Sequence, residues 1–386
     1  MRALKAIATV VSAVVLFLVS ALPAWAADSM TLTWVRHGES YGNIAGAGID
    51  TKVPGPELTE LGEEQAEAIA QQLKDGGYDS IYVSDMIRTH QTAAPLEALL
   101  SLSGIQEGGF REISAGIFEG SPIDSGLGRI GYFLIPVAWT LGLRSLPIPG
   151  GENGNGFEAR VNGAIASVIE NGDTDPVIFS HGATIMVWTM MNVDNPDVML
   201  MLTHPLGNTA VVVVTGNPED GWMLQSWDGV AVSQNPGLGG KMFVNIRNLI
   251  VAPQTAVYNV VQAVKSRDLT KVVAAIRDGV VTVAKAGVDF VKDSITDIAQ
   301  AIRGALPGGA AAKPAATAVK SAATPTATTG NKVVPGKANA GSSRRAGAAQ
   351  AASDDNGKSA TTGKADGGAK KGTGSSGRAS ASKAAA

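Results

Sequence analysis

The stretch Leu32-Thr33-Trp34-Val35-Arg36-His37-Gly38-Glu39-Ser40 joins a short apolar run to a polar loop that contains glycine. The run Leu32–Val35 has the length and composition of a buried strand. Similar apolar runs alternate along the chain with helical patterns; the runs are Ser80–Val83, Val177–Phe179 and Val211–Val214, and the helical patterns are Leu61–Leu73, Met86–Leu100, Phe157–Ile169 and Ala183–Met191. This alternation predicts an α/β fold, a three-layer sandwich in which helices flank a mainly parallel central sheet.

The loop after the first strand carries side chains suited to phosphate chemistry. It leaves the carboxyl end of the strand, where open α/β sheets form their ligand crevices. There Arg36 can clamp a phosphate through two hydrogen bonds, His37 can act as a nucleophile, and Gly38 lets the backbone approach a bound anion. The triplet alone is weak support, because a histidine at a strand end can equally be a structural residue that hydrogen-bonds a carbonyl.

Three more motifs follow at the ends of predicted elements. The segment Ser84–Ala93 places Arg88 at the start of a helix, from which a second guanidinium can reach the same crevice. The segment Arg111–Gly120 carries Glu112 in a loop punctuated by glycine. The apolar run Val177–Phe179 is followed by Ser180 and His181. The helix predicted after His181 favours an anion at its N-terminus.

Together these motifs resemble the histidine phosphatase superfamily, in particular its phosphoglycerate-mutase-like branch. The resemblance spans about Thr31–Gly216 and keeps the four motifs in the family's order. The acid-phosphatase branch is less similar. It has Arg-x-Pro after the Arg-His-Gly triplet and His-Asp at the second histidine, whereas this chain has Ser40-Tyr41 and His181-Gly182.

The resemblance implies a role for each matching residue. His37 would be phosphorylated during turnover, and Glu112 would protonate the leaving group. The phosphoryl oxygens would be held by Arg36, Asn43, Arg88 and His181. Two arginines and a histidine can neutralise these oxygens without a metal or another cofactor, and we expect none. A neutral imidazole nitrogen must attack the phosphorus, so we expect a backbone carbonyl near Gly38 to fix the tautomer of His37.

The segment Ser121–Gly151 is rich in glycine and apolar residues, and the resemblance implies that it is a lid over the substrate. Phosphoglycerate mutases carry several basic residues in this lid, which bind the substrate carboxylate. This chain has only Arg129 and Arg144 there, which puts mutase activity in doubt and favours hydrolysis of an ester with an apolar leaving group. Alternatively, the segment simply packs against the body or the C-terminal helices.

The N-terminus predicts export. Arg2 and Lys5 precede the uncharged run Ala6–Leu22, and Ala24-Trp25-Ala26 has the pattern of a cleavage site. Residues 1–26 are therefore interpreted as a signal peptide, with an uncleaved membrane anchor as the alternative. Both interpretations place the histidine phosphatase domain, residues 27–242, in the cell envelope or outside the cell.

The C-terminal part divides into two segments. Residues 243–305 have the spacing of amphipathic helices, with an interruption near Arg267-Asp268 and further candidate interruptions at Gly279 and Gly287. These helices would cover the body or each other; a membrane surface or an oligomer contact is the alternative. Residues 306–386 consist mainly of Ala, Gly, Ser, Thr, Lys and Pro, a composition typical of a disordered tail.

Charge is segregated along the chain, whose formal net charge is −3. The tail has twelve Lys and Arg against three Asp and Glu, a net +9, and the first 26 residues add two positive charges, so residues 27–305 carry about −14. An acidic body argues against nucleic-acid binding. The basic tail predicts a salt-sensitive contact with anionic envelope polymers or lipids.

The sequence thus predicts an enzyme, an exported, metal-independent phosphomonoesterase that acts through a phosphohistidine intermediate on a small-molecule or lipid phosphomonoester. The chain has no cysteine, which excludes disulfides, thiolate metal sites and a cysteine nucleophile. Two alternatives stay open. One is phosphoryl transfer of the phosphoglycerate-mutase type, and the other is a non-catalytic module that binds the cell envelope.

Overall fold

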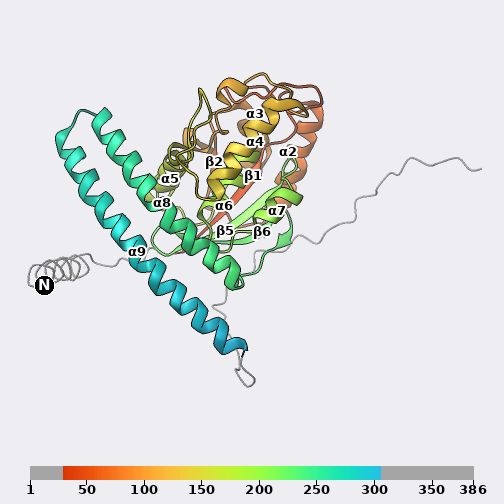
Figure 1. Ribbon diagram of the computed structural model, residues 1–386. Helices are drawn as coiled ribbons and strands as arrows, with labels where there is room; N and C mark the ends of the chain where they lie inside the picture. The colour runs from red at the N-terminus through yellow and green to blue at the C-terminus, as the bar shows by residue number, and fades with distance from the viewer. Residues whose placement is uncertain (1–28, 306–386) are drawn as a thin grey trace, which may run out of the picture. The chain divides into compact units, whose positions relative to one another are not determined.

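Seven strands form one sheet in the computed structural model, which describes residues 29–305 (Figure 1). The predicted signal peptide and tail lie outside the described residues. The strand order is β3-β2-β4-β1-β5-β6-β7. The strands are β1 (Met30–Arg36), β2 (Ser80–Val83), β3 (Gly104–Gln106), β4 (Pro176–Ser180), β5 (Val211–Asn217), β6 (Gly221–Trp227) and β7 (Val230–Ala231).

The sheet is mixed, with a parallel half and an antiparallel half. β3, β2, β4 and β1 run parallel to one another, and in the β1–β4 register Val35 pairs with Phe179. β5 pairs antiparallel with β1, placing Val211 opposite Val35, and β6 and β7 continue antiparallel. The four strands predicted from the apolar runs are therefore present, but β5, predicted as Val211–Val214, runs antiparallel to β1, and β3, β6 and β7 were not predicted.

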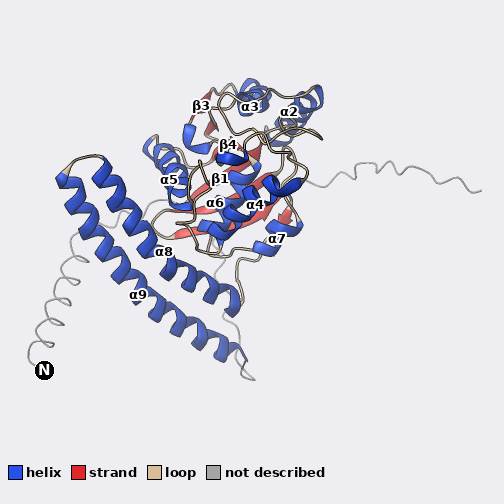
Figure 2. Cartoon of the chain, turned by 45° about the horizontal axis from the view of Figure 1, so that its top comes forward, coloured by secondary structure: helices blue, strands red, loops and turns tan. Residues whose placement is uncertain are grey.

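Helices cover both faces of the sheet, which confirms the three-layer prediction (Figure 2). Alternate residues of β1 pack against the helices on opposite faces of the sheet, because neighbouring residues of a strand point in opposite directions. Val35 packs in the same cluster as Ile69 and Ala93, whereas Trp34 packs on the other face against Trp188. The body helices are α2 (Glu60–Leu73), α3 (Ile87–Leu100), α4 (Gly126–Thr140), α5 (Gly154–Glu170), α6 (Gly182–Asn192) and α7 (Val198–Thr203), with 3₁₀ turns η1 (Gly108–Phe110) and η2 (Gly116–Phe118).

Two long helices follow the sheet, α8 (Leu238–Lys265) and α9 (Leu269–Ala305). They are separated where Arg267 adopts a φ of 57°, as predicted, but Gly279 and Gly287 do not interrupt α9. Such glycines are tolerated because a glycine inside a helix costs only about 1 kcal/mol relative to alanine. Within residues 29–305, no helix is long and apolar enough to cross a membrane.

Helix α8 is fastened to the body, and α9 lies along α8. Arg247 is 2 % exposed and donates from Nη1 to the carbonyl oxygen of Met190 at 3.1 Å. Gln254 donates to the carbonyl of Gly142 and accepts from the amide of Ser145, at 2.7 and 2.9 Å. The first half of α8 therefore covers the body, as one of the two predicted arrangements requires.

Candidate active site

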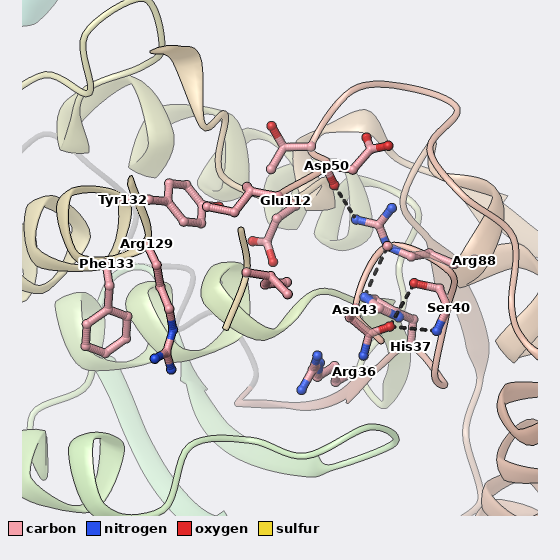
Figure 3. Close-up of a pocket in the computed structure, with 14 residues that line it drawn as sticks. Arg36, His37, Ser40, Asn43, Asp50, Arg88, Glu112, Arg129, Tyr132 and Phe133 are labelled. Atoms are coloured by element: carbon pink, nitrogen blue, oxygen red, sulfur yellow. Dashed lines mark hydrogen bonds between the residues drawn. The ribbon is translucent and has the colours of Figure 1, made fainter. Parts of the chain in front are cut away.

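The carboxyl ends of β1, β2 and β4 meet beside a cavity of about 160 Å³ (Figure 3). The end of β1 supplies Arg36, and the loop after it supplies His37 and Asn43. The start of α3 supplies Arg88, and the loop after η1 supplies Glu112. Five of the six site residues predicted from the sequence thus line one cavity. His181, the sixth, does not line it, but its ring centre lies 5.2 Å from that of His37.

The imidazole of His37 is held in a single neutral tautomer. Its Nδ1 lies 2.7 Å from the carbonyl oxygen of Gly38, which can only accept, so Nδ1 carries the proton. On the opposite side of the ring, Arg88 Nε donates to Nε2 at 3.1 Å, which requires a free lone pair there. The carbonyl expected near Gly38 is therefore present, and Nε2 is the atom able to act as a nucleophile.

Burial keeps this ring uncharged. His37 is 4 % exposed, and burial, followed by the positive charges of Arg88 and Arg36, holds its pKa well below the ordinary value of 6.5. His181 is fully buried, and its pKa is lowered well below 6.5 by burial first and by Arg88 second. Both histidines are therefore neutral at pH 7.

Three buried nitrogen atoms around His37 have no hydrogen-bond partner within the described residues: Arg36 Nε, Arg88 Nη1 and His181 Nδ1. Such atoms are costly to bury and are rare in folded proteins. Burial also lowers the pKa of both arginines, yet Glu112 opposes that shift and a guanidinium stays charged at neutral pH. Two cationic groups and a ring nitrogen are thus available to bind a small oxyanion.

The tautomer of His181 is coupled to Ser84, a residue whose role the sequence did not indicate. Ser84 Oγ lies 2.8 Å from His181 Nε2 and accepts from the amide of Met86 at 3.2 Å. When the Ser84 hydroxyl donates to Nε2, the proton of the neutral ring is on Nδ1. Nδ1 then becomes a donor, as a contact with an anionic oxygen requires.

The carboxylate of Glu112 is held at the N-terminus of α6. Oε1 accepts from the amides of Ile113 and Thr184, each at 2.9 Å, and from the Thr184 hydroxyl at 3.0 Å. Within the described part of the chain, Oε2 accepts a single long bond, 3.2 Å, from the amide of Ala183. The orientation of the carboxyl is therefore fixed through Oε1, and Oε2 is the oxygen with free capacity to exchange a proton.

Asn43 holds the loop of His37 in place as well as lining the cavity. Its Oδ1 accepts from the amide and hydroxyl of Ser40, at 2.6 and 2.8 Å. Its Nδ2 donates to Asn208 Oδ1 at 3.1 Å, and Asn208 in turn donates to the carbonyl of His37 at 3.3 Å. This chain of bonds ties the loop to the segment before β5.

A family model described as the histidine phosphatase superfamily (branch 1) matches residues 32–229, which is more than half of the chain. The chain belongs to the histidine phosphatase superfamily. The resemblance that the four motifs suggested is confirmed. Phosphatases and mutases both occur among the named relatives and structures of this superfamily that match the chain.

Two relatives and one solved structure illustrate the match. The PE-PGRS family protein PE_PGRS11 of Mycobacterium tuberculosis is 44% identical over 288 residues, which are 70% of this chain, and the chain spans about half (49%) of that relative's length. A probable phosphoglycerate mutase GpmB of Yersinia pestis is 32% identical over 158 residues, covering 39% of this chain and 69% of that protein. A solved mycobacterial glucosyl-3-phosphoglycerate phosphatase matches 52% of this chain and 99% of its own at 23% identity, with a TM-score of 0.43.

The mouth of this histidine phosphatase cavity is formed by α4, a helix within the predicted lid segment. Arg129, Tyr132 and Phe133 line the cavity from α4 (Figure 3). The Tyr132 hydroxyl donates to the carbonyl of Ile113 at 2.7 Å, which ties α4 to the loop of Glu112. Arg144 is elsewhere: it is 5 % exposed and forms an ion pair with Glu158. Of the two basic residues predicted for the lid, only Arg129 is at the mouth.

Two lining residues that the sequence analysis missed are Asp50 and Thr51. They lie in an irregular loop without hydrophobic periodicity, so no local signal identified them. Thr51 accepts from the amide of Ala115 at 3.0 Å and donates to the carboxylate of Glu119. Glu119 thus serves to join two loops and does not line the cavity.

The lowered histidine pKa values predict a loss of stability in mild acid. Below pH 6.5 the unfolded chain binds protons at His37 and His181, whereas the folded protein does not. The free energy of unfolding should therefore decrease as the pH falls from 6.5, by up to about 1.4 kcal/mol per pH unit for each histidine. Urea unfolding at pH 7.5 and 5.5 measures this decrease.

The double variant His37→Asn, His181→Asn should lose less stability between the two pH values, and the control His90→Asn should match the wild type. An unchanged pH dependence in the double variant would contradict the prediction.

Proposed function

We propose that the chain is a phosphomonoesterase that works through a phosphohistidine, without a metal. The observation that carries the proposal is the neutral His37, whose Nε2 lone pair faces Arg88 while Nδ1 is bound to the Gly38 carbonyl. A nucleophilic histidine must present such a nitrogen beside cationic groups that can accept the charge of a phosphoryl group.

The reaction has two displacement steps. In the first, His37 Nε2 forms a bond to phosphorus, the ester P–O bond breaks, and Glu112 gives its proton to the departing oxygen. In the second, water attacks the phosphohistidine, its proton passes to Glu112, and the P–N bond breaks to release inorganic phosphate. Arg36, Arg88 and His181 would stabilise the non-bridging oxygens in both steps. In the first step Arg88 Nε must exchange its bond to His37 for one to the phosphoryl group.

The mouth of the cavity favours hydrolysis of esters with an apolar leaving group. Tyr132, Phe133, Ile49 and Ile123 line the cavity, and among the described residues Arg129 is the only lining cation besides Arg36 and Arg88. A mutase must bind a second anionic group and retain a bisphosphate, and one exposed arginine offers little to hold them. The substrate class we propose is therefore a small-molecule or lipid phosphomonoester.

Export is a further part of the proposal. The signal-like pattern of residues 1–26 supports it, and it places the enzyme in the cell envelope or outside the cell. The alternative, an envelope module without catalysis, gives no reason for partnerless cationic donors to surround a neutral histidine.

A product assay with chelator tests the proposal. The protein from Ala27 onward is incubated with an alkyl phosphate, an aryl phosphate and phosphoglycerate, with and without EDTA. We expect inorganic phosphate from the first two at rates that EDTA does not change, and kcat/KM for phosphoglycerate at least about tenfold lower. As a control, Arg129→Ala should leave alkyl phosphate hydrolysis within about twofold. Isomerised phosphoglycerate without phosphate release would establish a mutase, and loss of activity in EDTA would contradict metal independence.

A further inference from the structure

Helix α9 exposes an apolar stripe along its length. Large aliphatic side chains recur at intervals of three or four residues, the spacing of one helix face. Val273, Val280, Val288 and Ile295 are each at least 63 % exposed. With about 1.5 Å of rise per residue, the 37 residues of α9 extend the stripe over about 55 Å.

The contact between α9 and α8 turns this stripe outward. The seam is made of small and polar side chains: Gly279 of α9 lies against Ala256 of α8, and Asp297 forms an ion pair with Lys241 at 3.1 Å. Asn245 donates to Asp297 at 3.1 Å. An apolar seam would have buried the valines and isoleucines, so the pairing observed here leaves them for another contact.

Helix α8 adds to the same apolar surface. Its Val257, Val261 and Val264 are 44–64 % exposed, on a side of α8 that faces neither the body nor α9. The body side of α8 is marked by Val244 and Arg247, which are buried. Both helices run side by side in Figures 1 and 2, so the surface is two helices wide.

The tail that follows α9 in the sequence differs in charge from the body. Within α9 five Lys and Arg nearly balance four Asp, and Lys285 is paired with Asp289 at 2.6 Å. Immediately after α9, residues 306–386 carry a net +9, whereas residues 27–305 carry about −14. An anionic surface would therefore attract the end of the chain that follows α9 and repel the body.

We propose that the exposed apolar surface of α8 and α9 binds an anionic lipid surface. The aliphatic stripe would enter the boundary between headgroups and acyl chains, and the basic tail would bind the headgroups. A second copy that packed its own α8 and α9 against the stripe would bring a net positive charge, because the two helices contain more Lys and Arg than Asp, and would offer the tail no anionic partner there. A soluble polyanion would bind the tail but not the stripe. A lipid surface is the partner that uses both features.

Vesicle co-sedimentation tests the proposal. The protein from Ala27 onward keeps every described element and omits residues 6–22, whose apolar run would bind vesicles by itself. We expect binding to phosphatidylcholine vesicles with about 30 mol% phosphatidylglycerol, weaker binding to pure phosphatidylcholine, and a decrease at about 0.5 M salt. The triple variant Ile276→Gln, Val288→Gln, Ile295→Gln should bind at least about tenfold more weakly.

Two further variants separate the contributions. Thr270→Gln, Thr282→Gln, Thr296→Gln changes three exposed threonines of α9 and should bind as the wild type does. Removal of residues 306–386 should abolish most of the preference for anionic vesicles. Circular dichroism and melting temperature should be the same for both triple variants, because all six positions are exposed.

Three results would overturn the proposal. Equal vesicle binding by the two triple variants would remove the stripe from the contact. A dimer in light scattering that the stripe variant converts to a monomer, with vesicle binding unchanged, would make a second copy the partner. The protein could also bind dextran sulfate as tightly as it binds vesicles, with neither affinity changed in the triple variant of the stripe. That result would make a polyanion the partner of the tail.

Discussion

Replacement of His37 by Ala should abolish hydrolysis, with a decrease in kcat of at least about 10⁴-fold, because a nucleophile and its covalent intermediate are lost together. The protein should still fold. Within residues 29–305 the His37 side chain hydrogen-bonds to the Gly38 carbonyl and to Arg88, and because it lines the cavity its removal should enlarge the cavity and leave the core packed.

Labelling identifies the reason for the loss. Wild-type protein quenched during turnover of a radiolabelled ester should retain phosphate that is labile in acid and stable in base, and His37→Ala should retain none. His90→Ala is the matched control, since His90 lies on α3 and does not line the cavity, and it should keep both label and activity. Near-normal turnover by His37→Ala would rule out the phosphohistidine mechanism.

The elements that position this site follow strongly local patterns, which is why the sequence predicted them. β2 was predicted with its observed bounds, and α2 begins beside Thr59, whose hydroxyl accepts from the amide of Gly62 at 3.0 Å. Because strand ends in a parallel sheet meet at one edge, placing His37, Arg88 and His181 after predicted strands was enough to predict that they lie near one another.

The parts that were not predicted depend on contacts between distant segments. α4 contains three glycines and Pro136, a composition that argues against a helix, and Tyr132 ties it to the loop of Glu112 through the carbonyl of Ile113. Arg144 and Arg129 lie in the same apolar, glycine-rich segment of the sequence, but Arg144 forms an ion pair with Glu158 on α5. Similarly, the pairing of His181 with Ser84 joins residues 97 positions apart.

The division into residues 1–26, 27–242, 243–305 and 306–386 stays a prediction. One boundary can be compared with the described elements: α8 begins at Leu238, a few residues before the start assigned from the sequence. The apolar spacing becomes regular only after the two glycines in the first turn of α8, so the sequence pattern placed the start of this helix too late.

Substitution of Glu112 by Gln should separate proton donation from phosphate binding. The amide oxygen of Gln can still accept from the amides of Ile113 and Thr184, so the side chain should keep its position at the N-terminus of α6. It cannot give a proton to an alkoxide. Esters with poor leaving groups should therefore lose about 10²- to 10⁴-fold in the first step, and activated aryl phosphates, which need little protonation, should lose less than about tenfold.

The measurement must isolate the first step, because in the proposed mechanism Glu112 also takes the proton from water in the second. A burst of aryl alcohol should precede slow turnover in Glu112→Gln, and the phosphohistidine should accumulate to a greater extent than in the wild type. Glu107→Gln is the matched control, since this loop carboxylate does not line the cavity. Equal losses for alkyl and aryl esters in the first step would show that another group protonates the leaving oxygen. Absence of the burst with the aryl ester would instead assign Glu112 to holding the phosphoryl group, because the first displacement would then limit the rate for that ester as well.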